Sequence, residues 1–159
     1  MAITMLKTQP EPTQSSGQLS TFYVADLFFG VDVLHVQEVL RFQPMTPVPQ
    51  APGVIEGLIN LRGQIVTAID MRRRLLLPPR PSGQSPMNIV VRTSDGAVSL
   101  LVDEIGDVMQ MDASSYERPP ANLARAAREI IRGVYKLNDK LLLVIDEERT
   151  ADPVAGRTT

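Results

Sequence analysis

The chain has 159 residues, which is enough for one ordinary domain or two small lobes that fold without a metal or a disulfide. Its net charge of −2 and its 4% aromatic content argue against nucleic-acid binding, which relies on clustered basic side chains or stacking rings. The chain contains no cysteine, so disulfides, thiolate chemistry and cysteine zinc sites are excluded and a reducing compartment is allowed.

Both ends of the chain are polar. Residues 1–19 lack the apolar stretch of a signal peptide and are predicted to form a disordered tail. Residues 151–159 are predicted to form a flexible C-terminal tail, which leaves residues 20–150 for the folded domain. No run of 18 apolar residues occurs, so we predict no membrane-spanning segment and expect the protein in the cytoplasm.

Between the tails, most of the chain has the composition of short β-strands. The predicted strands cover residues 21–24, 30–33, 65–69, 88–92, 98–102 and 141–145. Asp95-Gly96 predicts a hairpin turn. One helix is expected at residues 121–130, where alanine and arginine dominate, and a helical turn at residues 71–76. A proline-rich segment at residues 77–86 is predicted to divide the chain, as the connection between two lobes near residues 77–87.

The most informative pattern is an internal repeat, in which residues 55–73 align without gaps to residues 131–149. The matched pairs are Ile55/Ile131, Gly57/Gly133, Leu61/Leu137, Ile69/Ile145, Asp70/Asp146 and Arg73/Arg149. A looser upstream match sets Val31, Val33, Val36 and Val39 against Leu100, Val102, Ile105 and Val108. Because short sheets leave exposed edges unless they curl closed, we predict an all-β fold of two similar five-stranded barrels. Chance similarity between β segments is the alternative.

Few residues have the pattern of a catalytic or metal site. His35 is the only histidine, and without a second histidine or a cysteine at ligand spacing we interpret it as a half-exposed surface residue. Asp70 and Asp146 occupy the same repeat position, so equivalent turn or capping residues are a better interpretation than paired catalytic carboxylates. A phosphate loop and a nucleophile elbow are both absent from the sequence, and we therefore predict no enzymatic activity, no cofactor and no metal.

One pair of charged residues has two equally supported interpretations. Arg62 precedes Gly63 at a predicted hairpin tip, and Glu38 lies next to a strand of the same half. An arginine held in one orientation by Glu38 is suited to meet a protein partner. A surface salt bridge with little energetic weight is the other interpretation.

Four segments in the same order resemble the signatures of the CheW-type chemotaxis coupling proteins. They are residues 28–39, residues 46–70 with the core Asn60-Leu61-Arg62-Gly63, residues 98–108, and residues 131–146. Together these segments span nearly all of residues 20–149.

The resemblance implies two five-stranded SH3-like barrels and a non-catalytic adaptor that links the tips of methyl-accepting chemoreceptors to the regulatory domain of the histidine kinase CheA. It places receptor binding in the groove between the barrels, at Val36, Glu38, Gly57, Asn60, Arg62 and Gly63. Kinase binding is implied at the barrel ends, with no residues assigned. Neither the receptors, the kinase nor the pathway follows from the sequence.

Two features depart from the family pattern. The segment after the last predicted strand is polar and reaches a proline at Pro153, so the hydrophobic C-terminal helix common in the family is expected to be short here. The proline-rich segment at residues 77–86 is expected to lengthen a loop. A small-barrel nucleic-acid binder is the second functional hypothesis, which the acidic balance and the few aromatics oppose.

Overall fold

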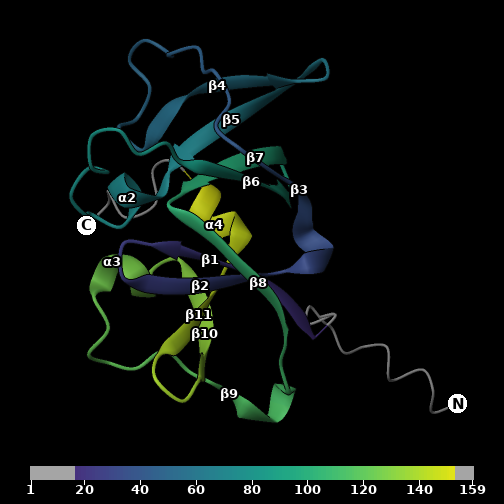
Figure 1. Cartoon of the computed structure of the whole chain (residues 1–159), viewed down its shortest axis with the longest axis vertical. Coiled ribbons are helices and arrows are strands. Elements are labelled where there is room, and N and C mark those ends of the chain that lie inside the picture. Colours follow the sequence, from purple (N-terminus) through teal and green to yellow (C-terminus); the bar gives the residue numbers. More distant parts are fainter. Residues whose placement is uncertain (1–16, 153–159) are drawn as a thin grey trace, which may run out of the picture.

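The computed structural model describes residues 17–152, which form two β-sheets and a few short helical turns (Figure 1). The strands are β1 (Gln18–Val24), β2 (Leu27–Asp32), β3 (Val36–Leu40), β4 (Ile55–Leu61), β5 (Gln64–Asp70), β6 (Met87–Thr93), β7 (Gly96–Val102), β8 (Glu104–Gln110), β9 (Tyr116–Glu117), β10 (Ile131–Lys136) and β11 (Leu141–Ile145). The helical elements are the 3-10 turns η2 (Val33–His35) and η3 (Ala113–Ser115) and the helices α2 (Met71–Arg74), α3 (Arg125–Arg128) and α4 (Glu147–Ala151). The predicted all-β class is confirmed.

We call the two sheets lobe 1 and lobe 2. Lobe 1 is a five-stranded sheet with the strand order β3-β6-β7-β5-β4, and lobe 2 is a six-stranded sheet with the order β8-β1-β2-β11-β10-β9. Figure 1 shows lobe 1 above lobe 2, with α4 between them. Each sheet adopts an SH3-like curl, and its two edge strands are not joined by a backbone ladder.

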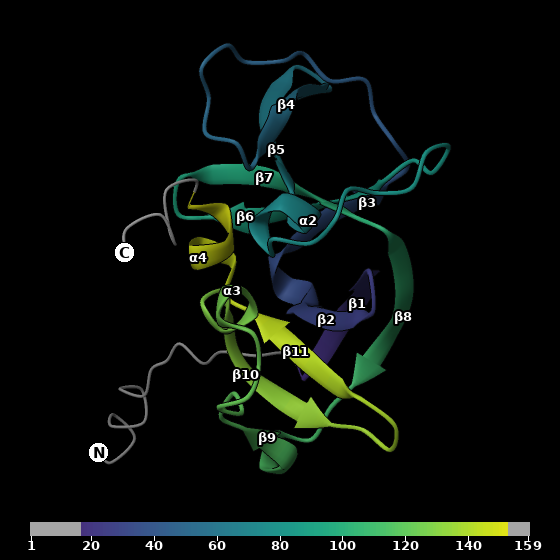
Figure 2. The same cartoon turned by 90° about the vertical axis from the view of Figure 1, so that its left-hand side faces the viewer.

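The two lobes exchange strands. After β1 and β2 of lobe 2, the chain crosses through η2 into β3 of lobe 1, and β7 of lobe 1 continues into β8 of lobe 2. Figure 2 shows β8 running along one side of the molecule from one lobe to the other. The proline-rich segment connects α2 to β6, so it is a loop of lobe 1 and not the predicted connection between lobes. Sequence order alone did not reveal this, because both crossings are short and contain no proline.

The internal repeat has a matching backbone register. In the β4–β5 hairpin Ile55 lies opposite Ile69, and in the β10–β11 hairpin Ile131 lies opposite Ile145. In both hairpins the register shifts between this first residue and the glycine two positions later. The looser upstream match is also structural, because β2 and β7 each pair in parallel with the second strand of a repeat hairpin.

Asp70 and Asp146 are equivalent capping residues, as predicted. Each carboxylate accepts a backbone N–H at the start of the following helix, α2 or α4. Each also contacts the arginine three residues later, with the Arg73 and Arg149 Nε atoms both 3.3 Å from a carboxylate oxygen. The repeat therefore extends from the strands into the helix that ends each hairpin.

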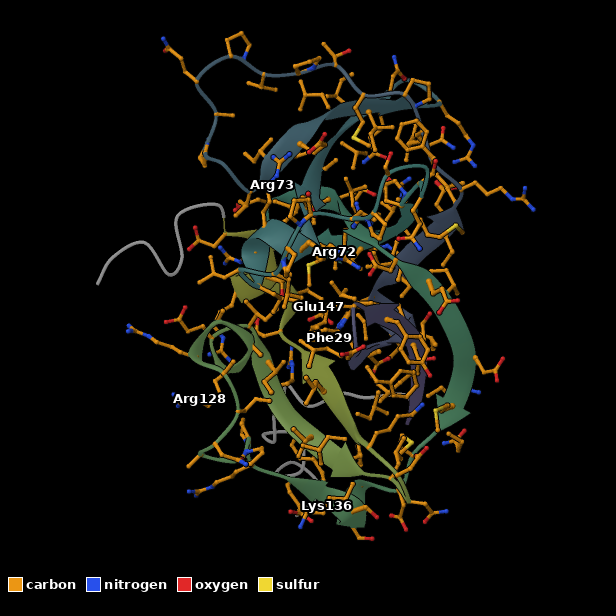
Figure 3. The ribbon with its side chains drawn as sticks, turned by 60° about the vertical axis from the view of Figure 1, so that its left-hand side comes forward. Phe29, Arg72, Arg73, Arg128, Lys136 and Glu147 are labelled. Carbon is orange, nitrogen blue, oxygen red and sulfur yellow. The ribbon has the colours of Figure 1, made fainter. Side chains whose placement is uncertain are left out.

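Three apolar clusters hold the fold together, and the largest is shared between the lobes. The lobe 1 cluster comprises Ile59, Leu61, Val66, Ala68, Val90 and Leu101, and the lobe 2 cluster comprises Leu19, Phe28, Leu142 and Val144. The alternate residues of the same strands, such as Ile69 of β5 and Leu143 of β11, join the shared cluster together with Phe22 and Phe29. Phe29 lies at the middle of the molecule (Figure 3). Burial on both faces explains why these strands are continuous apolar runs.

Several predicted boundaries needed adjustment. Val33 belongs to η2 and not to a strand, the helical turn predicted at residues 71–76 ends at Arg74, and Ala151 belongs to α4 and not to the predicted tail. Helix α3 covers only four of the predicted residues 121–130. At its start, the side chain of the N-cap residue Ala124 makes no capping hydrogen bond. Beyond its end, the Ile130 carbonyl accepts a hydrogen bond from the Asp146 N–H and so belongs to the strand region. Strand β1 begins at Gln18 and Leu19 is buried, so the predicted tail of residues 1–19 includes two strand residues. Residues 1–16 and 153–159 lie outside the described part, and the rest of the tail predictions stay predictions.

A half-buried ionic cluster holds the β7-to-β8 crossing. Asp103 accepts hydrogen bonds from the Arg72 Nη2 at 2.6 Å, the Arg80 Nε at 2.8 Å and the Ala25 backbone N–H at 2.7 Å. Arg72 also donates to the carbonyl of Pro78, which fastens the proline-rich loop. Burial alone would raise the pKa of Asp103, but these hydrogen bonds outweigh it and lower the pKa from 3.8 to about 2.

The Asp103 carboxylate should stabilise the fold in a defined pH range. Since its pKa is lower in the folded state, its contribution is fully present above about pH 5 and is lost as the pH falls from about 4 towards 2. Asp103→Asn should lower the free energy of unfolding at pH 7 by about 1–2 kcal/mol after allowance for solvent screening. Urea unfolding between pH 2 and 7 measures this difference. Asp107→Asn, at an exposed position of β8, is the control, and a difference that stays constant down to pH 2 would contradict the assignment.

Candidate functional site

The site begins at a strained turn between β4 and β5. Leu61 pairs with Gln64, and the two residues between them both have positive φ angles, 51° for Arg62 and 89° for Gly63. This is the backbone of a type I′ hairpin, which a glycine adopts readily and an arginine does not. The Asn60 side chain accepts the Gly63 N–H at 2.9 Å and so holds the turn. The sequence therefore sets an exposed guanidinium on a rigid two-residue tip.

Glu38 of β3 receives that guanidinium through two parallel hydrogen bonds. The Arg62 Nη1 and Nη2 atoms each lie 2.7 Å from a different carboxylate oxygen of Glu38. The hydrogen bonds lower the pKa of Glu38 from its ordinary value and raise that of Arg62, so both groups stay charged across the physiological range. The Arg62 side chain is 73% exposed and that of Glu38 only 17%, so the arginine faces solvent while the carboxylate supports it.

The ion pair also bridges the open side of lobe 1. β3 and β4 are the two edge strands of this sheet, so no backbone ladder joins them. Besides the Arg62–Glu38 pair, the Gln37 Nε2 donates to the Gln64 Oε1 at 3.3 Å across the same gap. Side chains thus hold together two edges that the backbone leaves apart.

The other two predicted site residues are placed differently. Val36, at the start of β3, is half-buried against the shared core and pairs with Val91 of β6. Gly57 is buried, and a Cβ atom there would lie 2.8 Å from the Thr46 carbonyl oxygen. Thr46 and Leu58 exchange two backbone hydrogen bonds, of 2.9 and 2.8 Å. Gly57 therefore supports the segment that precedes β4 and presents no surface of its own.

Lobe 2 does not repeat the ion pair. In the alignment of the two repeats, Asp107 of β8 is the counterpart of Glu38, and Asn138 is the counterpart of Arg62. An asparagine carries no charge, so the equivalent turn of lobe 2 has no guanidinium to offer. The two lobes share a fold and differ in chemistry at this position.

Apolar side chains next to the pair were not among the predicted site residues. Leu34 is 56% exposed, Val39 39% and Phe42 47%, and all three flank Glu38 along the chain. The sequence signal for them is the presence of large apolar residues in and beside a predicted edge strand.

His35 links η2 to α4. Its Nδ1 atom lies 2.8 Å from the Glu147 Oε2, and the Arg132 Nη2 donates to the other oxygen of Glu147 at 2.8 Å. Figure 3 shows Glu147 between the two lobes. The predicted half-exposed histidine is thus a structural link. Within residues 17–152, no three histidine, aspartate or glutamate side chains are grouped to hold a metal, and no helix is long and apolar enough to cross a membrane.

The fold and site define a two-lobed SH3-like β protein with one preformed charged site. Residues 18–153 match the model of the CheW-like domain, and the chain belongs to this family. It is 30% identical to the chemotaxis protein CheW of Bacillus subtilis over 141 residues, which cover 89% of this chain and 90% of that protein. It is 28% identical to the chemotaxis protein CheW of Treponema pallidum over 133 residues, which cover 81% of this chain and 78% of that protein. The crystal structure of the scaffolding protein TtCheW from Thermoanaerobacter tengcongensis matches with a TM-score of 0.74 and 30% identity, over 81% of this chain and 88% of that one.

The two repeat glycines should differ in their tolerance of a side chain. Gly57→Ala pushes a Cβ atom against the Thr46 backbone and disrupts its pairing with Leu58, which should cost about 1–3 kcal/mol of unfolding free energy. At Gly133 the obstacle is the end of the Tyr116 ring, and this half-exposed side chain can swing away, so Gly133→Ala should cost less. Urea unfolding of both variants measures the two losses of unfolding free energy. An equal or larger loss for Gly133→Ala would contradict this account of Gly57.

Proposed function

We propose that this chain is a non-catalytic adaptor that couples methyl-accepting chemoreceptors to the histidine kinase CheA, with the receptor bound at the Arg62–Glu38 site. Membership of the CheW-like family supports the coupling role, and the matched relatives carry the names chemotaxis protein and scaffolding protein. The observation that carries the site assignment is the two-bond ion pair on a strained turn, present in lobe 1 and replaced in lobe 2.

The geometry of the pair suits recognition of another protein. Arg62 is mostly exposed, yet Glu38 already holds it in one orientation, so little side-chain freedom is lost when a partner binds. Only two of its nitrogens are used by Glu38, and its remaining N–H donors can meet carbonyl or carboxylate acceptors of a receptor helix. Leu34 and Phe42 are exposed and lie four residues before and after Glu38 in the chain, so they are available to add apolar contact area.

The proposal gives the six nominated residues separate roles. Arg62 and Val36 contact the receptor, and Glu38 orients Arg62. Asn60 and Gly63 hold the turn, and Gly57 supports the segment around Thr46 that precedes β4. The kinase regulatory domain binds at the lobe ends, away from this site, and the protein acts at the cytoplasmic face of the membrane within receptor arrays. Neither binding event needs a cofactor.

Arg62→Ala should weaken binding to a chemoreceptor-tip fragment by roughly 10- to 100-fold, the range for an interface anchor. Binding to the CheA regulatory domain should stay within about twofold of the unmodified protein, because its contacts lie elsewhere. Isothermal titration with each partner measures both affinities. The matched control is Arg125→Ala, since Arg125 is 72% exposed and is paired with Glu129 in lobe 2.

A double variant that exchanges the two residues, Arg62→Glu with Glu38→Arg, separates the role of the guanidinium in receptor binding from the effect of the ion pair on stability. It keeps an opposite-charge pair across the gap and removes the guanidinium from the turn, so it should fold normally and still lose receptor binding. Equal losses for receptor and kinase, or a large fall in melting temperature for Arg62→Ala, would mean that Arg62 is structural and that the site assignment is wrong.

A further inference from the structure

His35 lies at the point where the chain crosses from lobe 2 into lobe 1. It is the last residue of η2, and β3 begins with the next residue, Val36. It is also the only histidine of the chain. Histidine ordinarily changes its charge between about pH 5 and 8, so the contacts of this one side chain decide whether the crossing responds to pH.

The imidazole contacts a buried carboxylate of α4. The His35 Nδ1 atom lies 2.8 Å from the Glu147 Oε2, and only 6% of the Glu147 side chain is exposed, against 41% of the His35 side chain. A neutral imidazole donates this hydrogen bond in only one of its two tautomers, whereas a protonated one always donates it and adds an ionic attraction. Much of the ring still reaches water, so a charge on it stays partly hydrated. The geometry therefore gives a stronger contact when the ring is protonated.

Two arginines oppose a positive charge on the ring. Arg132 of β10 donates to the other oxygen of Glu147 at 2.8 Å, so the carboxylate can serve two cations with one oxygen each. Arg92 of β6 donates to the two backbone carbonyls that flank His35 in the chain, at 3.1 and 3.3 Å. Arg92 is exposed, so water and salt screen its charge. Neither arginine uses the Glu147 oxygen that faces the imidazole.

The remaining neighbours of η2 do not oppose protonation. Asp32 of β2 caps η2, with its carboxylate accepting the Leu34 N–H at 2.9 Å, and so adds a negative charge three residues before His35. Strand β1, which also packs against η2, carries no aspartate, glutamate, histidine, lysine or arginine. The direct contact with Glu147 outweighs the screened and shared charges, because electrostatic attraction falls with distance and rises with burial. A proton on His35 therefore strengthens the link between the crossing and α4.

Helix α4 is held to lobe 1 at a second place. Glu148, next to Glu147, accepts the Ser94 backbone N–H at 2.7 Å and the Ser94 hydroxyl at 2.9 Å, at the turn between β6 and β7. Strand β6 in turn pairs with β3, where Val36 lies opposite Val91. Two neighbouring carboxylates thus fix the crossing and the β3–β6 pair to the end of the lobe 2 hairpin, and of the two only Glu147 contacts a histidine.

We propose that His35 and Glu147 form a pH-dependent latch between the lobes, which tightens when His35 is protonated. With the protonated ring an ion pair fixes the crossing to α4, and with the neutral ring a single uncharged donor does so. Because the contact exists only in the folded protein and is stronger with the protonated ring, its contribution to stability rises as the pH falls from 8 to 5.5. The latch does not depend on the proposed receptor coupling, because it concerns the link between the lobes.

Urea unfolding of the full chain between pH 5.5 and 8 tests the latch. Side-chain carboxylates are ordinarily ionised throughout this range, and the contribution of Asp103 is fully present, so neither varies. The ratio of the unfolding equilibrium constants of His35→Gln and the unmodified protein should be about fivefold larger at pH 5.5 than at pH 8, the difference between a charge-assisted and a neutral hydrogen bond. His35→Lys is the matched control. It keeps a positive charge throughout, so its stability relative to His35→Gln should not change with pH.

Hydrogen exchange of one backbone amide gives a local measurement at the crossing. The Val36 N–H donates to the Val33 carbonyl and closes η2. After correction for the intrinsic exchange rate, its protection should rise about fivefold between pH 8 and pH 5.5 in the unmodified protein and stay constant in His35→Gln. The Leu137 N–H, which donates to the Lys140 carbonyl at the β10–β11 turn, is the control and should show no such rise.

Three results would overturn the latch. One is an equal pH dependence in the unmodified protein and in His35→Gln, because the histidine would then not be its origin. Another is a His35→Lys variant whose stability follows the pH course of the unmodified protein. The third is a Glu147→Gln variant that keeps the full pH dependence, which would assign the effect to Asp32. The two His35 variants decide the question even if Glu147→Gln does not fold. Chemoreceptor binding enters none of these measurements, so the proposed function is tested separately.

Discussion

The shared apolar core between the lobes is the feature on which the rest of the structure depends. The central strands bury one face within their own lobe and the other against the second lobe, so either lobe alone would expose a whole sheet face to water. Strand exchange also joins the lobes through the backbone at two places, because β3 of lobe 1 follows β2 of lobe 2 and β8 of lobe 2 follows β7 of lobe 1. The position of Glu38 opposite Arg62 is a consequence of this crossing.

At each crossing, one polar side chain contacts the helix that follows a repeat hairpin. His35, at the crossing from β2 to β3, contacts Glu147 of α4, and Asp103, at the crossing from β7 to β8, accepts from Arg72 of α2. The arrangement is symmetric, since the crossing into lobe 1 contacts α4 at the end of the lobe 2 hairpin and the crossing into lobe 2 contacts α2 at the end of the lobe 1 hairpin. Half-buried charges stabilise only when they are well paired. Asp103 pairs with Arg72 and Arg80, and Glu147 pairs with Arg132 and lies within hydrogen-bond distance of His35.

The repeats keep the same backbone and differ where a partner can bind. Lobe 1 has a guanidinium on a strained turn, whereas lobe 2 has the uncharged Asn138 at the equivalent turn. A two-fold repeat on its own would present two equal surfaces. The two repeats therefore present different surfaces on the same fold, which is consistent with function residing in sites and not in the fold.

The sequence by itself determined most of the strands, the hairpin repeat, the capping role of Asp70 and Asp146 and the family, because these depend on local residue patterns and on short spacings. It also brought Glu38 and Arg62 together as candidates, through the resemblance and a turn signal. Only the tertiary structure decided that the lobes exchange strands, that Gly57 acts through Thr46, and that His35 contacts Glu147. Those facts depend on contacts between residues far apart in the chain, and nothing in the local pattern of apolar and polar residues records which sheet a strand joins or which side chain covers it.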